Sequence, residues 1–98
     1  MNSKVTEISP GFFLDLEYLA VKFGDESINL TSTEYEILKI LLDNRGKPVP
    51  YSRFAQTIWK EIKNKENAIR IQISKLRGKH PVFKSNIRAI RGKGYLLS

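Results

Sequence analysis

The sequence has no cysteine and only one histidine among its 98 residues. Without thiols the chain forms no disulfide, no thiolate metal site and no thiol nucleophile. The histidine, His80, stands directly before a proline, with no carboxylate or nucleophile close to it in sequence. No group of His, Asp and Glu residues has the spacing of metal ligands. These absences predict that the chain is not an enzyme and that it needs neither a metal nor another cofactor.

Long apolar runs are also missing. No stretch approaches the roughly 18 residues that a membrane span requires, and the first ten residues lack the apolar segment of a secretory signal. No Gly/Ser/Pro-rich linker and no internal repeat divides the chain. We therefore expect one domain over residues 1–98 and a cytoplasmic location, which the lack of cysteine also fits.

Acidic residues are scarce in the second half of the chain. Residues 1–49 contain five Lys/Arg and eight Asp/Glu, a net charge of −3, whereas residues 50–98 contain twelve and two, a net charge of +10. Such a division within one domain indicates a basic face that attracts nucleic acid or an anionic membrane. A lysine-rich surface that is merely solvated is the alternative.

The first half contains short strand patterns followed by a helix. The strands are expected at Val5–Ile8, Phe12–Leu14, Ala20–Phe23 and Ser27–Asn29, with turns at Pro10-Gly11 and Gly24-Asp25. They predict a small antiparallel sheet over residues 4–30. Thr31 and Glu34 then form a capping box that begins a helix, and Asn44-Arg45-Gly46 ends it.

Two further helices and a hairpin follow. The second helix begins after Pro50, with Ser52 as its expected N-cap. The third runs from about Lys65 to Lys79, capped by Asn64 and ended by Pro81. In residues 86–98 two apolar strands enclose an Arg-Gly-Lys-Gly tip. A sheet, a three-helix core over residues 31–79 and a hairpin predict an α+β winged helix-turn-helix, in which the third helix enters the major groove and the hairpin is the wing.

The third helix carries an apolar stripe on one side. Ile69, Ile73 and Leu76 follow the i, i+4, i+7 pattern and are expected in the core. The opposite side has Asn67, Ile71, Ser74 and Gly78 along its middle, Arg70 and Arg77 on one flank, and Lys75 and Lys79 on the other. This arrangement fits a major groove, where the flanking cations meet phosphates and the central residues approach base edges.

Three residues of this helix have competing interpretations. Ile71 either packs in the core or is held outward to touch thymine methyl groups, and the flanking cations favour the second. Asn67 either reads adenine through a bidentate contact or merely begins the helix, and the sequence does not separate these. Arg70, in the first turn, is the better candidate for reading guanine.

The hairpin is crowded with cations, namely Arg88, Arg91 and Lys93. Its glycines permit a tight tip with positive φ angles. The hairpin is either simply solvated or a wing whose Arg91 enters a narrow, A·T-rich minor groove, where negative potential is concentrated. Tyr95 is expected to pack on the body of the domain and so to fix the angle of the wing.

The chain resembles the OmpR/PhoB family, the winged-helix output domains of bacterial two-component response regulators. The resemblance is carried by Leu30-Thr31, Glu34, Leu38, Leu41-Leu42, Gly46, Pro48-Val49, Ser52, Trp59, Ile73, Leu76-Arg77 and Ile90-Arg91-Gly92-x-Gly94-Tyr95. It covers nearly the whole chain, including the N-terminal four-stranded sheet. The paired signals Leu-Thr-x-x-Glu and Arg-Gly-x-Gly-Tyr are specific at this spacing.

The resemblance implies bacterial transcription control, with the third helix in the major groove, Arg91 in the minor groove and a homodimer on direct repeats. It also implies that the loop before the third helix contacts RNA polymerase in some members; its candidate residues here are Lys60, Glu61, Lys63 and Lys65. No receiver domain precedes residue 1, so we expect either a stand-alone regulator or the C-terminal domain of a longer protein.

Several positions depart from the family pattern. Lys60 replaces the usual glycine after the tryptophan, and Ala89 replaces a common threonine, which puts one phosphate contact in doubt. Arg70 replaces a common acidic residue, so the preferred base sequence should differ. The connection from Arg77 to Ile87 is short.

An RNA-binding or protein-binding winged helix is the alternative function. RNA readers usually display stacking aromatic side chains on a sheet or loop, whereas here the aromatic residues lie in the N-terminal strands and the helix cores. Double-stranded DNA is therefore the expected partner, and no membrane association is expected.

Overall fold

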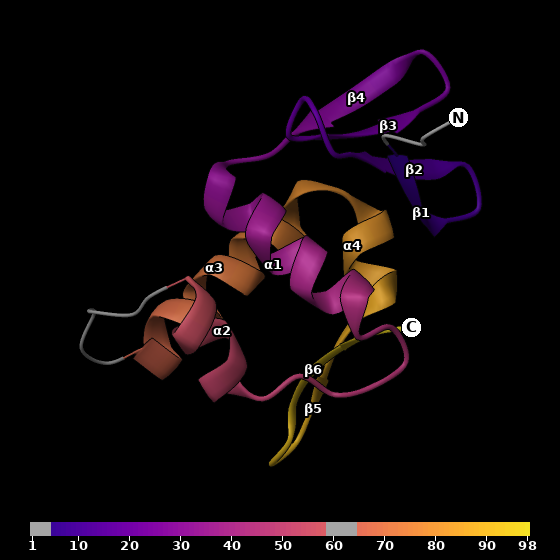
Figure 1. Ribbon diagram of the computed structural model, residues 1–98. Helices are drawn as coiled ribbons and strands as arrows, with labels where there is room; N and C mark the ends of the chain where they lie inside the picture. Colours follow the sequence, from indigo (N-terminus) through magenta and orange to yellow (C-terminus); the bar gives the residue numbers. More distant parts are fainter. Residues whose placement is uncertain (1–4, 59–64) are drawn as a thin grey trace.

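A computed structural model describes residues 5–58 and 65–98. The strands are β1 (Val5–Ser9), β2 (Phe12–Asp15), β3 (Ala20–Phe23), β4 (Glu26–Asn29), β5 (Ile87–Ile90) and β6 (Gly94–Leu97). The helices are α1 (Ser32–Asp43), α2 (Tyr51–Thr57), α3 (Lys65–Lys79) and α4 (Pro81–Asn86). Figure 1 shows the N-terminal sheet across one end of the helices, and the hairpin of β5 and β6 projecting from the opposite end.

The N-terminal sheet is an antiparallel meander in the order β1-β2-β3-β4. Alternating side chains point to the helices, because Ile8, Leu14 and Val21 are fully buried. The predicted strands are thus confirmed with changes of one residue at some ends. The sheet covers the core that the helices form, and leaves their other end for the wing.

The capping box of α1 is confirmed. The Glu34 backbone N–H donates to Thr31 Oγ1 at 3.1 Å, and the Thr31 N–H donates to the Glu34 carboxylate at 2.8 Å. Asn44 is the C-cap, as its sequence predicts. Ile37, Leu38 and Leu41 are buried, so α1 belongs to the core.

Two helix predictions need correction. The N-cap of α2 is Pro50, not Ser52, which lies inside the helix. The short connection between Arg77 and Ile87, for which no helix was predicted, contains the additional helix α4. His80 caps α4, since its Nδ1 accepts a hydrogen bond from the Val82 N–H at 3.0 Å, and the apolar residues of α4 join the core. The three-helix core is therefore a four-helix core.

The wing is anchored to the body through Tyr95. The Val49 N–H donates to the Tyr95 carbonyl at 2.6 Å, and the Tyr95 N–H donates back at 3.0 Å. The Tyr95 ring lies edge-on to Tyr51 and Phe54, with centroid separations of 5.8 and 6.5 Å. The prediction that Tyr95 packs on the body is confirmed, and this pairing fixes the direction of the wing.

Candidate nucleic-acid interface

Helix α3 has one buried side and one exposed side. It packs against α1, α2 and α4, and Ile69, Ile73 and Leu76 are at most 1% exposed. The predicted central residues of the other side, Asn67, Ile71, Ser74 and Gly78, are all exposed. Ile71 is 46% exposed, so the interpretation that it packs in the core is wrong.

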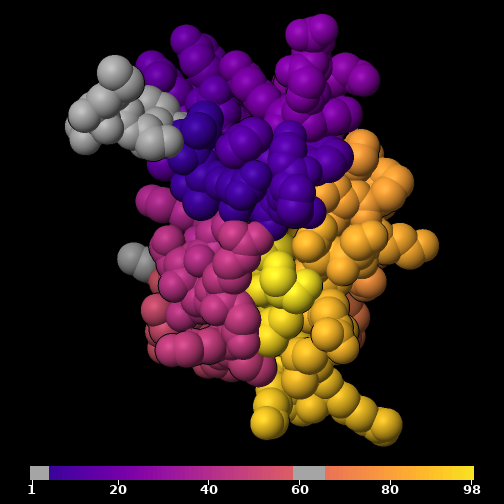
Figure 2. Space-filling view, turned by 90° about the vertical axis from the view of Figure 1, so that its right-hand side faces the viewer, coloured from indigo at the N-terminus to yellow at the C-terminus, as the bar shows by residue number. Residues whose placement is uncertain are grey.

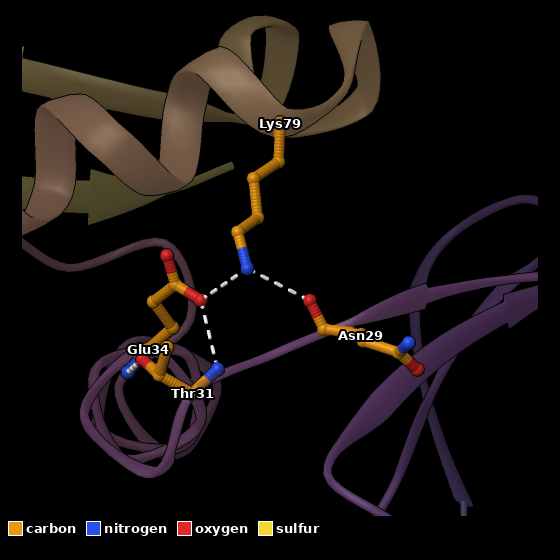
Figure 3. Close-up of polar contacts among 4 residues, drawn as sticks. All are labelled: Asn29, Thr31, Glu34 and Lys79. Carbon is orange, nitrogen blue, oxygen red and sulfur yellow. Dashed lines mark hydrogen bonds and ion pairs between the residues drawn. The ribbon is translucent and has the colours of Figure 1, made fainter.

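The cations of α3 do not all lie on the exposed side. Arg70 and Lys75 are exposed and Arg77 is half-buried. Lys79, predicted to flank the groove, instead points back into the domain. Its Nζ lies 2.5 Å from the Glu34 carboxylate and 2.8 Å from the Asn29 carbonyl oxygen, as Figure 3 shows. Lys79 therefore fixes the end of α3 to the start of α1 and is not a free phosphate contact.

Arg70 is held by two neighbours. Its guanidinium lies 3.3 Å from Glu66, one helical turn earlier, and both side chains are largely exposed. The pKa of Arg70 is raised, chiefly by a hydrogen bond with the Tyr51 hydroxyl and then by the coulombic interaction with that group. Tyr51 begins α2, so this electrostatic interaction connects Arg70 with the neighbouring helix.

The same tyrosine contacts the base of the wing. Burial raises the pKa of the Tyr95 hydroxyl, and its hydrogen bond with Tyr51 raises it further, while Arg70 and Arg77 act in the opposite direction. The two tyrosines and two arginines therefore lie within electrostatic reach of one another. This cluster connects α2, α3 and the wing. Fixed relative positions of α3 and the wing would allow both to contact the same binding partner.

The wing presents its three cations outward. Arg88, Arg91 and Lys93 are exposed, and the Lys93 N–H donates to the Ile90 carbonyl at 2.9 Å to close the turn. Gly92 has a φ of 76° at the tip, where a residue with a side chain would be strained. Arg91 and Lys93 therefore flank a tight tip at the far end of the molecule.

The predicted polymerase-contact loop is only partly described. Lys60, Glu61 and Lys63, together with Trp59 and the predicted cap Asn64, lie outside the described residues. Lys65, which the family resemblance placed in this loop, belongs to the first turn of α3. The predicted start of the third helix at about Lys65 is thereby confirmed.

Other kinds of site find little support. Among residues 5–58 and 65–98, no three His, Cys, Asp or Glu side chains are grouped so that they could hold a metal ion. No helix in the described part of the chain is long and apolar enough to cross a membrane. The exposed, basic surfaces of α3 and the wing are therefore the candidate binding surfaces of the domain.

Residues 25–97 match the protein family described as "Transcriptional regulatory protein, C terminal". The chain belongs to this family. The OmpR/PhoB resemblance and the winged-helix fold are thereby confirmed. Its Leu-Thr-x-x-Glu and Arg-Gly-x-Gly-Tyr motifs correspond to the capping box of α1 and to the anchored wing.

Similar regulators are longer than this chain. The Response regulator ArlR of Staphylococcus epidermidis is 28% identical over 90 residues, which cover 89% of this chain and 41% of ArlR. The Virulence transcriptional regulatory protein PhoP of Salmonella typhi is 33% identical over 101 residues, covering 96% and 43%. The chain spans about two-fifths of the length of these relatives.

Solved structures agree on the fold. The DNA-binding domain of CpxR from E. coli is 27% identical with a TM-score of 0.79, covering 97% of this chain and 96% of that one. The C-terminal domain of the nisin resistance regulator NsrR is 28% identical with a TM-score of 0.75, covering 94% and 96%. These two domains therefore share the fold of this chain over nearly its whole length.

Sequence reasoning missed two side chains of this OmpR/PhoB-type domain that lie near the exposed face. Tyr51 gave no signal, because its contact with Arg70 joins residues of different helices. Lys84 lies on α4, which was not predicted. The pair His80-Pro81 is the signal that would have found that helix, since proline favours the first helical position.

Proposed function

We propose that this domain binds double-stranded DNA sequence-specifically and regulates transcription, with α3 in the major groove and the wing in the minor groove. One observation carries the proposal: Ile71 is exposed on the side of α3 opposite the core, with Arg70 and Lys75 exposed beside it. An exposed apolar residue between cations suits a thymine methyl group between two phosphate walls.

Structural relatives support duplex DNA as the partner. The RstA DNA-binding domain of Klebsiella pneumoniae was solved in complex with the RstA box, and the AdeR DNA-binding domain in complex with an intercistronic region. Their TM-scores of 0.80 and 0.78, at 20% and 23% identity, establish a shared fold. These two complexes make duplex DNA the partner to test for the exposed cations of α3 and the wing.

Ile71→Ala should change sequence preference more than non-specific affinity. Loss of one apolar base contact should cost about 1 kcal/mol at a preferred site, while the phosphate contacts of random DNA remain. Sites selected from a random duplex pool supply the preferred sequence. Equilibrium binding to that site and to a scrambled duplex then measures both effects.

Leu16→Ala is the matched control, because Leu16 is 38% exposed and lies in the turn between β2 and β3 of the N-terminal sheet. It should leave both affinities unchanged. An Ile71→Ala protein that loses equal affinity for the selected and scrambled duplexes would show that Ile71 reads no base. Preferred binding of single-stranded RNA at matched salt would overturn the proposed partner itself.

Arg91→Ala should weaken specific binding by about 1–3 kcal/mol and reduce the preference for A·T pairs beside the major-groove site. A guanidinium is more weakly hydrated than an ammonium group and enters a narrow groove more readily. Because Arg91 is exposed at the tip, the fold should remain intact. The test compares two operators that differ only in that flank, one A·T-rich and one G·C-rich.

Lys93→Ala is the control for Arg91. As a plain phosphate contact, Lys93 should contribute equally on both operators. Equal losses on both operators for Arg91→Ala would make Arg91 another backbone contact and remove the minor-groove assignment.

The partners of the whole protein follow from the family and are part of the proposal. We expect a homodimer on direct-repeat sites, a cytoplasmic location and, through residues 60–65, a contact with RNA polymerase. Copies bound side by side on adjacent half-sites should show cooperative binding that is lost when the spacing is changed by half a helical turn.

A further inference from the structure

Helices α3 and α4 border a surface hollow that joins three residues of the recognition helix to one residue of α4, an element without an assigned function. We call it the α3–α4 hollow; it has a volume of about 230 Å³ and is lined by Ser74, Arg77, Gly78 and Lys84. Three of these residues lie on one face of α3, at positions i, i+3 and i+4, and the fourth comes from α4. The lining offers a hydroxyl, a guanidinium and an ammonium group, and no carboxylate.

The cations of the hollow have no acidic partner among the described residues. Within residues 5–58 and 65–98, the ion pairs of basic side chains involve Lys22, Arg70 and Lys79. The Arg77 Nε is buried and has no hydrogen-bond acceptor in the described structure. The Nε itself is closed to solvent, so an anion in the hollow would bind the part of the half-buried Arg77 side chain that lines it, in a charge-assisted contact.

Gly78 leaves open space at the edge of the hollow, which a partner molecule could fill. A glycine inside a helix destabilises it relative to alanine, yet a Cβ at Gly78 would meet nothing within 4 Å. Packing within the domain therefore does not require the glycine. The absence of a side chain leaves room for an external backbone, next to exposed Ser74 on the face that meets DNA.

We propose that the α3–α4 hollow binds one phosphate of the DNA backbone. Lys84 then becomes a DNA contact outside both the recognition helix and the wing. In Figure 2 the orange surface that includes α4 and the tip of the hairpin lie on the same side of the view. This inference rests on the proposed DNA binding and extends it to a third element of the fold.

Lys84→Gln tests the assignment with little risk to the fold, because Lys84 is exposed. Each phosphate contact contributes about 0.9 to the slope of log K against log salt. The variant should therefore show a slope shallower by about 0.9, which corresponds to about eightfold weaker binding at 0.1 M salt if both proteins bind equally at 1 M. Lys39→Gln, at an exposed position of α1, makes the same charge change and should leave the slope unaltered.

A second measurement identifies the phosphate. Duplexes that each carry one neutral methylphosphonate linkage are bound to wild type and to Lys84→Gln. At one linkage, wild type should lose affinity and Lys84→Gln should lose little further. Equal slopes for Lys84→Gln and wild type, or the absence of such a linkage, would overturn the inference while leaving DNA binding intact. A wild-type domain that binds no duplex would overturn the proposed function, and this inference with it.

Discussion

Lys79→Met should lower the free energy of unfolding by about 3 kcal/mol. The Lys79 side chain is 30% exposed, but its removal leaves the charge of the buried Glu34 without compensation. Glu34 is 3% exposed and pairs with Lys79 at 2.5 Å. Lys79 also binds the Asn29 carbonyl, so the substitution separates the end of α3 from both the start of α1 and the end of β4 (Figure 3). Urea unfolding followed by circular dichroism measures the change.

The double variant is the informative control for this ion pair. Glu34→Gln keeps an amide oxygen that can still accept from the Thr31 N–H, and it removes the buried charge. Lys79→Met combined with Glu34→Gln should therefore be more stable than Lys79→Met alone, a non-additivity expected of directly paired residues. Additive losses would show that the two side chains do not stabilise one another.

The Lys79 variant also separates a structural role from a DNA contact. Under conditions where it is folded, Lys79→Met should bind random duplex DNA as wild type does. A salt slope shallower by about 0.9 would instead assign a phosphate contact to Lys79.

Gly94→Ala should be at least as damaging, with a loss of about 3 kcal/mol or more. Gly94 is buried and has a φ of 123°. A Cβ at this position would overlap the Val49 carbonyl oxygen and lie 2.9 Å from the Pro50 Cα. The wing would have to move away from the body, at the expense of the paired hydrogen bonds between Val49 and Tyr95.

Gly92→Ala is the matched control for the wing. Gly92 also has a positive φ, of 76°, but a Cβ there would meet nothing within 4 Å. Only the backbone strain remains, which costs roughly 1 kcal/mol. Similar losses of stability for the two variants in urea unfolding would show that the contact with Val49 is not what requires glycine at position 94.

The sequence predicted those parts of the fold that depend on interactions between residues close together in the chain. The capping box uses residues three apart, and the stripe of Ile69, Ile73 and Leu76 uses helical spacing, so both could be read without the fold. The same spacing placed Ile71 on the opposite side, and the structure shows it exposed.

Contacts between distant residues could not be predicted in this way. On a helical wheel Lys79 belongs with Lys75, but its partner Glu34 lies 45 residues earlier in the chain. The link between Tyr51 and Arg70 likewise depends on how α2 packs on α3. Helix α4 has only six residues, which is too short for an apolar period, and only its Pro81 start was visible.

The proposed functions of the site residues all require that the basic half of the chain binds the DNA backbone. The salt dependence of duplex binding tests this most directly. The affinity for a selected duplex is measured as the salt concentration is raised. If α3, the wing and their neighbours neutralise about five phosphates, log K should fall against log salt with a slope near −4.5. A slope near zero would contradict the claim that the basic half of this chain grips the DNA backbone.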